Sequence, residues 1–189
     1  MSHRMVSVYA DESCLGNGRD GENPGGAAGL IEYPGARDDR TTRLDYWISE
    51  PATTNNRMAL RSAIEALHIL SRKRNRLRVR FTSDSQYLVK GMREWVAGWR
   101  ARGWRRKEGA IENLTLWQQL YDLSLTHDVD WQWVRGHNEH PQNEYADHLA
   151  TRAAREQTES GGPVPSLYVE WLQAQRAKGR LAHTVSGTE

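Results

Sequence analysis

The order in which β-prone and helical segments follow one another limits this chain to a narrow set of folds. Three short β-prone stretches come first, and helical patterns interleaved with two further β-prone stretches follow. The early stretches are 6–10, 28–33 and 43–48, and the later ones are 77–82 and 129–133. Short links rich in Gly and Pro favour an antiparallel meander, and the later alternation favours helices packed on the faces of a sheet. We therefore predict an α/β fold with a five-stranded mixed sheet flanked by helices.

The helical segments are recognised by apolar residues that recur every three or four positions. From Asn56 to about Leu70 this pattern is clear, and either Thr54 or Asn55 can cap its start. Further helices are expected up to about 99, over 113–123 and over 144–156. One domain, residues 1–155, accounts for these elements, and 156–189 is a C-terminal tail in which 160–165 reads as a linker and Leu167 to Lys178 as a short helix.

The net charge of +2 conceals two strongly basic segments. The first is Arg72, Lys73, Arg74, Arg76, Arg78 and Arg80, and the second is Arg93, Arg100, Arg102, Arg105, Arg106 and Lys107. We interpret the first as a solvated face. Trp95, Trp99 and Trp104 are interspersed in the second, and flat rings beside cations suit a sugar-phosphate backbone.

Composition also bears on the compartment. The single cysteine, Cys14, excludes an internal disulfide framework and fits a reducing environment. No apolar run has the length of a membrane span, and the N-terminus has no apolar signal core. We expect a cytoplasmic protein without a membrane partner, and a monomer.

Three aspartates stand where a metal site could form. Asp11 and Asp84 each end a predicted strand, and Asp147 is placed in the first turn of the last predicted helix. Any one of them alone reads as a cap or a turn residue. Together they provide the oxygen ligands that Mg²⁺ prefers, with water and phosphate oxygens completing the octahedron.

The segments around these aspartates resemble type 1 ribonuclease H, which cuts the RNA strand of an RNA/DNA hybrid. They are Tyr9-Ala10-Asp11-Glu12-Ser13, Thr53-Thr54-Asn55-Asn56-Arg57-Met58-Ala59, Phe81-Thr82-Ser83-Asp84-Ser85-Gln86, Trp133-Val134-Arg135-Gly136-His137 and Asn143-Glu144-Tyr145-Ala146-Asp147. The resemblance covers roughly 5–155. It implies the ribonuclease H fold and two Mg²⁺ or Mn²⁺ ions held by Asp11, Asp84 and Asp147. It also implies that His137 assists turnover and that the products carry a 5′-phosphate and a 3′-hydroxyl.

Ala59 departs from the family, which has a metal-binding glutamate at this position. Three interpretations are open: the residue was changed to trap a substrate complex, the natural protein is inactive or slow, or another carboxylate has taken over. Glu12 is the candidate replacement, because the family shows Asp-Gly-Ser where this chain has Asp11-Glu12-Ser13. Neighbouring strand residues point to opposite faces, so a role as metal ligand requires the strand to end at Asp11. The other interpretation of Glu12 is a solvated loop residue.

The resemblance also implies a set of substrate contacts. Asn17, Asn55 and Gln86 match positions that contact bases and 2′-hydroxyls in the minor groove, and Thr54 matches a phosphate contact. The segment 95–107 resembles the basic protrusion that binds the DNA strand, with Trp95 and Trp104 partly in the core and Trp99, Arg100, Arg102 and Arg105 facing the substrate. The alternative function is a catalytically inactive module that binds RNA/DNA hybrids through the same surface.

Overall fold

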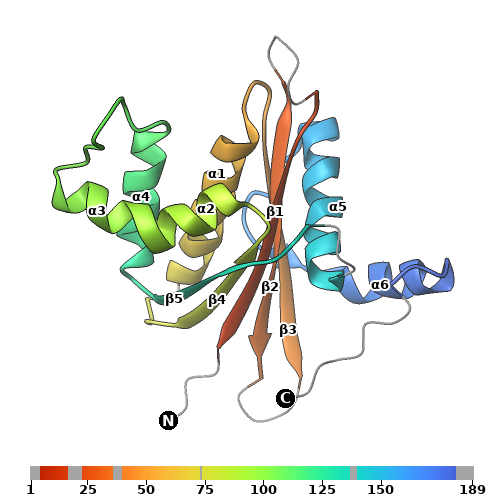
Figure 1. Cartoon of the computed structure of the whole chain (residues 1–189). Coiled ribbons are helices and arrows are strands. Elements are labelled where there is room, and N and C mark those ends of the chain that lie inside the picture. The colour runs from red at the N-terminus through yellow and green to blue at the C-terminus, as the bar shows by residue number, and fades with distance from the viewer. Residues whose placement is uncertain (1–4, 17–22, 36–39, 73, 137–139, 182–189) are drawn as a thin grey trace.

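The computed structural model describes residues 5–16, 23–35, 40–72, 74–136 and 140–181, and shows a central sheet with helices on both faces (Figure 1). The sheet has six strands in the order β5-β4-β1-β2-β3-β6. They are β1 (Val6–Cys14), β2 (Gly25–Pro34), β3 (Thr41–Glu50), β4 (Arg78–Ser83), β5 (Asp128–Trp133) and β6 (Val164–Pro165). The five predicted strands are present. The sixth is a two-residue strand in the segment predicted to be a linker.

The strands pair as a mixed sheet. β1, β2 and β3 form an antiparallel meander, in which Tyr9 pairs with Leu30 and Leu30 with Asp45. β1, β4 and β5 are parallel, so that their carboxyl ends meet at one edge of the sheet. This edge is where an α/β sheet commonly places its ligand site.

The helices begin close to the predicted positions. They are α1 (Asn55–Ser71), α2 (Gln86–Lys90), a π-helical turn η1 (Gly91–Trp95), α3 (Val96–Ala101), α4 (Leu114–Ser124), α5 (Pro141–Glu156) and α6 (Tyr168–Ala177). Thr54 caps α1, since its Oγ1 accepts a hydrogen bond of 3.2 Å from the main-chain N–H of Arg57. Because α5 begins at Pro141, Asp147 lies in the second turn of this helix and not, as predicted, in the first.

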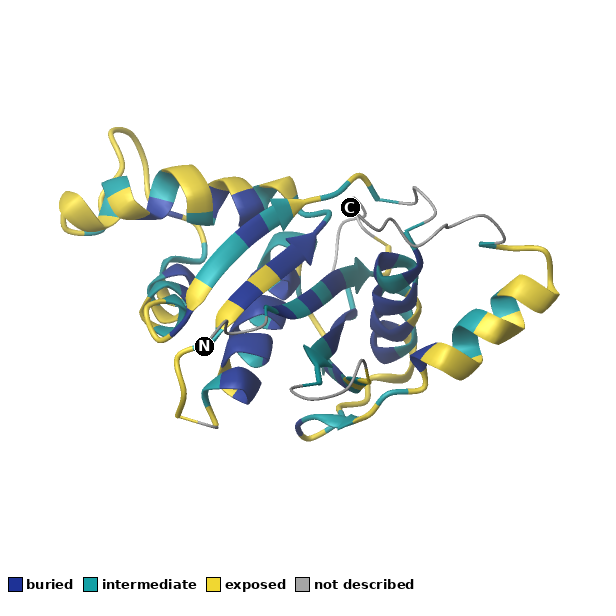
Figure 2. Ribbon diagram, turned by 90° about the horizontal axis from the view of Figure 1, so that it is seen from below, coloured by how far each residue is buried: buried dark blue, intermediate teal, exposed yellow. Residues whose placement is uncertain are grey.

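Apolar side chains fill both faces of the sheet, and Figure 2 shows that many residues of the strands and of the helices against them are buried. On one face, α1 and α4 cover a core in which Phe81, Leu67 and Trp117 are fully buried. On the other face α5 lies unusually close to β2, because a side chain at Gly26 would overlap the main chain of α5 at Ala150. This close packing fixes the position of α5 on the sheet.

The C-terminal segment is attached to the sheet. β6 pairs with β3 through Leu44 and Pro165, and the main-chain N–H of Ser160 donates a hydrogen bond of 3.0 Å to the carbonyl of Trp47. The predicted helix at 167–178 is α6, and Tyr168 at its start is only 5% exposed. The segment predicted as a linker therefore packs on the edge of the sheet. Within the described ranges, no helix has the length and apolarity needed to cross a membrane.

Candidate active site

The end of strand β4 leaves an open edge along β1. The parallel pairing of the two strands stops where Ala10 meets Ser83, whereas β1 continues along β2 as far as Cys14. Asp11 and Glu12 therefore lie on β1 beyond the last paired residue of β4, and Asp84 directly follows β4. Side chains from both faces of β1 can approach each other around this edge.

Three carboxylates meet at the open edge. One oxygen each of Asp11, Glu12 and Asp84 lies within 4.8 Å of the other two. Asp11 is 6% exposed, and its Oδ1 accepts a hydrogen bond of 2.8 Å from the main-chain N–H of Glu12. The predicted pair Asp11 and Asp84 is thus brought together, and Glu12 joins it.

We predicted that Glu12 could be a metal ligand only if the strand ended at Asp11. This condition was wrong, because β1 runs on to Cys14. Alternate residues of a strand point to the same face of the sheet, so Glu12 points to the same face as Val8 and Ala10. Val8 and Ala10 belong to the same buried cluster as Ala59. Tyr46 belongs to this cluster too, and its pKa is raised mainly by burial and in part by the charge of Glu12. Glu12 therefore faces the α1 side of the sheet, the side from which the carboxylate at position 59 is missing.

The electrostatics of the cluster favour a cation. The pKa of Asp11 is raised to about 10 by burial first, and then by the charges of Asp84, Glu12 and Asp147. The pKa of Glu12 is raised to about 8 by burial and by Asp84. Carboxylates that are difficult to ionise together are stabilised by a hard cation, which accepts several oxygen ligands. The donors present thus fit Mg²⁺ or Mn²⁺.

Two residues after β5 hold Asp84 in place. The indole Nε1–H of Trp133 donates a hydrogen bond of 2.9 Å to the main-chain carbonyl of Asp84. Gly136 lies so close to the Asp84 carboxylate that a side chain there would overlap Oδ2. Neither role was predicted from the sequence. The motif Trp133-Val134-Arg135-Gly136 was noted, but only for the histidine that follows it.

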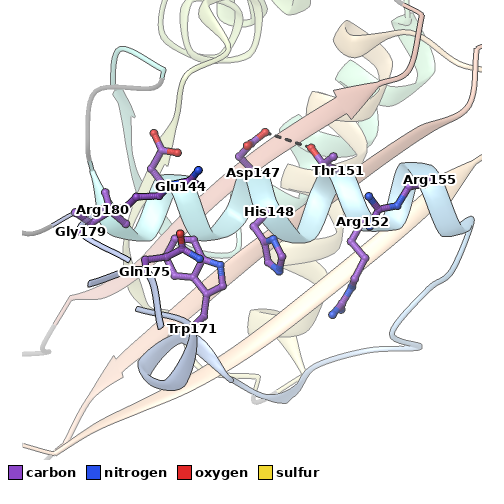
Figure 3. Close-up of a pocket in the computed structure, with 11 residues that line it drawn as sticks. Glu144, Asp147, His148, Thr151, Arg152, Arg155, Trp171, Gln175, Gly179 and Arg180 are labelled. Carbon is purple, nitrogen blue, oxygen red and sulfur yellow. Dashed lines mark hydrogen bonds between the residues drawn. The ribbon is translucent and has the colours of Figure 1, made fainter. Parts of the chain in front are cut away.

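Asp147 lies outside the group of three carboxylates. Thr151, one turn further along α5, donates a hydrogen bond of 3.5 Å to Asp147 Oδ1 (Figure 3). Asp147 is nevertheless within electrostatic reach, because its charge contributes to the raised pKa of Asp11. Asn143, one turn before it, is 3% exposed, and its Oδ1 has no hydrogen-bond partner among the described residues. No role for this amide was predicted from the sequence.

The predicted substrate contacts lie in several places. Thr54 is exposed at the start of α1 and serves as its cap, and Asn55 begins the helix with a buried Oδ1 that has no partner among the described residues. Gln86 is exposed at the start of α2, two residues after Asp84. His137 and Asn17 fall outside the described residues.

The basic segment forms α3 and the loop after it. Arg100, Arg102 and Arg105 are exposed, as predicted for a surface that binds phosphates. Trp99 is partly buried like Trp95 and Trp104 and packs in the same aromatic group, so that its facing the substrate stays a prediction. Its ring centroid is 5.8 Å from that of Trp95 and 5.7 Å from that of Trp117. The five described arginines of the first basic segment (Arg72, Arg74, Arg76, Arg78, Arg80) are exposed, in agreement with a solvated face.

A mixed sheet with acidic residues at the carboxyl ends of β1 and β4 defines a nuclease-like protein of the ribonuclease H fold. The family model described as RNase H matches residues 3–155. Ribonuclease H of Pelobacter propionicus is 44% identical over 152 residues, which are 80% of this chain and 85% of the relative. Ribonuclease H of Stutzerimonas stutzeri is 43% identical over 153 residues, which are 80% and 93% of the two chains. This chain therefore belongs to the RNase H family of endoribonucleases.

Two solved structures are informative. The crystal structure of LC9-RNase H1, described as a type 1 RNase H with the type 2 active-site motif, is 57% identical, with a TM-score of 0.85, and the match covers 95% of this chain and 87% of that one. The crystal structure of LC11-RNase H1 in complex with an RNA/DNA hybrid is 16% identical, with a TM-score of 0.57 and coverage of 80% and 98%. The second match shows a shared fold.

Proposed function

We propose that this chain hydrolyses the RNA strand of RNA/DNA hybrids with two divalent cations, and that Glu12 supplies the carboxylate that Ala59 cannot. The observation that carries the proposal is the cluster in which oxygens of Asp11, Glu12 and Asp84 lie within 4.8 Å of one another. The relatives named ribonuclease H support cleavage of the RNA strand. The similar LC9-RNase H1 is described as a type 1 RNase H with the type 2 active-site motif, which supports a departure from the usual type 1 active site.

The cations would be Mg²⁺ or Mn²⁺, held by Asp11, Glu12 and Asp84 with Asp147 as a further ligand. When bound, they would activate a water and stabilise the leaving oxygen in an in-line displacement. Water would form a new bond to phosphorus as the bond between phosphorus and the 3′-oxygen breaks. The products would carry a 5′-phosphate and a 3′-hydroxyl.

The residues around the cluster orient its ligands. The main-chain N–H of Glu12 holds Asp11, and Trp133 and Gly136 set the position of Asp84. Thr151 holds Asp147. Such positioning is valuable because the ligands would not need to reorganise when substrate and cation arrive. His137 would assist proton transfer or product release, a role in which histidine side chains commonly serve.

The DNA strand of the hybrid would be held on the side of the sheet that carries α1 to α4. Gln86, Asn55 and Asn17 would contact bases and 2′-hydroxyls, since amides both donate and accept hydrogen bonds. Thr54 would contact a DNA phosphate. The exposed Arg100, Arg102 and Arg105 would follow the DNA strand, with Trp95, Trp99 and Trp104 forming their support. We place the reaction in the cytoplasm, where a free Cys14 is stable.

Cleavage of a labelled RNA/DNA hybrid in Mg²⁺, and separately in Mn²⁺, tests the proposal. We expect the chain as written to cut the RNA strand, and Asp84→Asn and Glu12→Gln each to lower kcat by at least about 100-fold while hybrid binding persists. Asp84→Asn also controls for contaminating nuclease. Tight binding without cleavage by the parent would instead support the inactive hybrid-binding module. Equal cleavage by Glu12→Gln and its parent would contradict the replacement of the glutamate by Glu12.

A further inference from the structure

The C-terminal segment forms a cleft with α5, and Asp147 is among the residues that line it (Figure 3). Its volume is about 680 Å³. Its lining includes the charged or aromatic residues Asp147, His148, Arg152, Arg155, Trp171 and Arg180. Trp171 and Arg180 lie beyond residues 3–155, the part of the chain matched by the family model. The cleft is thus partly built by a segment that the family match does not include.

Three arginines from two different elements line this cleft, with Arg180 at one end and Arg152 and Arg155 toward the other (Figure 3). The guanidinium of Arg152 lies over the ring of Trp47, 4.9 Å from its centroid. Arg152 and Arg155 come from α5, and Arg180 comes from the turn after α6. Arg155 is exposed, and its contact with Glu156 is a long one of 3.9 Å between partly exposed groups, which contributes little to stability. Arg180 is exposed and makes no ion pair with a carboxylate of the described part of the chain. These cations remain available for a ligand.

Flat rings line the same cleft. Trp171 and His148 have ring centroids 5.9 Å apart with an angle of 34° between their planes. His148 is exposed and Trp171 is partly exposed. Cations combined with accessible rings form a surface typical of single-stranded nucleic acid binding, in which the backbone follows the cations and bases stack on the rings. An apolar ligand would leave the guanidinium groups without partners.

Asp147 lines the cleft from α5, the helix that packs against β1, the strand of Asp11 and Glu12. The cleft and the carboxylate cluster therefore lie on adjoining elements. The basic segment with Arg100, Arg102 and Arg105 belongs to the opposite side of the sheet, as α3 and α5 show (Figure 1). Because the proposed function assigns the DNA strand to α3, the strand left for the cleft is the RNA strand.

We propose that the cleft between α5 and α6 binds the RNA strand beyond the scissile phosphate, where that strand continues single-stranded past the end of the hybrid. This inference rests on the proposed function, since the strand would be guided by the same carboxylates. Arg155 and Arg180 would contact phosphates, and Trp171 with His148 would stack on a base. The cleft would thereby favour hybrids that carry an RNA extension on one side.

The test compares the affinity for a blunt hybrid with the affinity for the same hybrid extended by single-stranded RNA at its 5′ or its 3′ end. EDTA is present so that nothing is cut. We expect one RNA extension to bind more tightly than the blunt hybrid. The double variant Arg155→Gln/Arg180→Gln should lose roughly fivefold in affinity for that extended hybrid, on the scale of two exposed ion pairs. For this variant, the slope of the logarithm of the binding constant against the logarithm of the salt concentration should become shallower by about 1.4. This corresponds to about 0.7 for each single-strand phosphate contact.

The matched control is Arg176→Gln/Lys178→Gln, which removes the same charge from exposed residues of the same segment that do not line the cleft. Equal losses in the two double variants would overturn the proposal, and so would an equal gain from a single-stranded DNA extension. A lack of any gain from either RNA extension would overturn it as well. Cleavage of the blunt hybrid in Mg²⁺ is measured in parallel, because its absence would count against the proposed function itself and its presence leaves only the cleft in question.

Discussion

The carboxylate of Asp84 lies against the α-carbon of Gly136, on the side where any other residue would carry its side chain. A Cβ at this position would overlap Oδ2 of Asp84. Trp133, three residues earlier, donates its indole N–H to the main-chain carbonyl of the same aspartate. The end of β5 and the residues after it therefore determine where a ligand at the end of β4 is placed.

Gly136→Ala should displace the Asp84 carboxylate and so disturb the metal cluster. We expect kcat to fall by up to about 100-fold, because a displacement of about 1 Å at a reacting centre can cost that much. The Mg²⁺ concentration needed for half-maximal activity should rise. The affinity for the hybrid and Tm serve as controls, because neither should change when only the carboxylate of Asp84 is displaced. If Gly136→Ala cuts as fast as its parent, the contact does not position the ligand.

The proposed exchange of carboxylates predicts a rescue. Glu12→Gly alone should abolish cleavage, whereas the combination with Ala59→Glu should restore it, because that pair returns the family arrangement. Ala59 is 1% exposed and lies in the same cluster as Ala10, so a glutamate at 59 would have to reach the open edge of β1. The measurement is kcat of the single and double variants. A double variant no more active than Glu12→Gly, with an unchanged Tm, would argue against exchange.

The raised pKa values of Asp11 and Glu12 predict how the metal-free protein responds to pH. In the range between the ordinary carboxyl pKa and about 8, the folded protein keeps protons that the unfolded chain has lost. The contribution of these two carboxyls to stability must therefore fall as pH rises through this range. Burial lowers the pKa values of His127, His140 and His148, whose contribution changes in the opposite direction, but the two carboxyl shifts extend over more of the range. In EDTA we expect Tm to drop by several degrees from about pH 5 to about pH 8, since 1 kcal/mol corresponds to about 2–4 °C in a domain of this size.

Mg²⁺ should oppose this loss, and its stabilising effect should grow with pH because it binds the ionised carboxylates. Asp84→Asn supplies the control, because it removes a charge that raises both pKa values. A Tm that rises with pH in EDTA, or a Mg²⁺ effect that is the same at both ends of the range, would contradict this account.

The sequence identified the ligands of the candidate site but predicted their spatial arrangement less well. Asp11 and Asp84 stand at the ends of strands with a clear alternation, so their proximity follows from parallel pairing. Glu12 was judged by alternation alone, which places it on the face opposite to Asp11. The open edge left by the end of β4 changes that conclusion, and it depends on where a partner strand stops rather than on β1 itself. Gly136 was not recognised either, because its role is a contact across the fold.

The elements of the fold were predicted well because their periodicities are strong, as in α1, where Ala63, Ala66, Leu67 and Leu70 are all fully buried. The first residue of α5 was missed because Pro141 carries no apolar periodicity, although proline suits the first turn of a helix. The pairing of β6 could not be predicted, since a two-residue strand has no pattern of its own. Its position depends on hydrogen bonds to β3 that lie far away in the sequence.

The attachment of the C-terminal segment gives a final prediction. Tyr145 of α5 donates a hydrogen bond of 2.6 Å to the buried Asp45 of β3, and the main-chain N–H of Leu167 donates one of 3.3 Å to the same oxygen. Burial raises the pKa of Asp45, and these donors oppose the rise. Ending the chain after Gln157 would remove the donor at Leu167 and expose the surface that Tyr168 covers.

We expect this truncation to lower the free energy of unfolding by at least about 2 kcal/mol, the scale of burying one large side chain, as measured by urea denaturation. Removing only the residues after 181 is the matched control and should leave stability nearly unchanged, since α6 and its contacts remain. The chain that ends at Gln157 should also need more Mg²⁺ for cleavage, because the truncation removes contacts of α5, the helix that carries Asp147. Equal stability of the two truncated chains would mean that residues 1–157 form the folded unit alone and that the contacts of Leu167 and Tyr168 are dispensable.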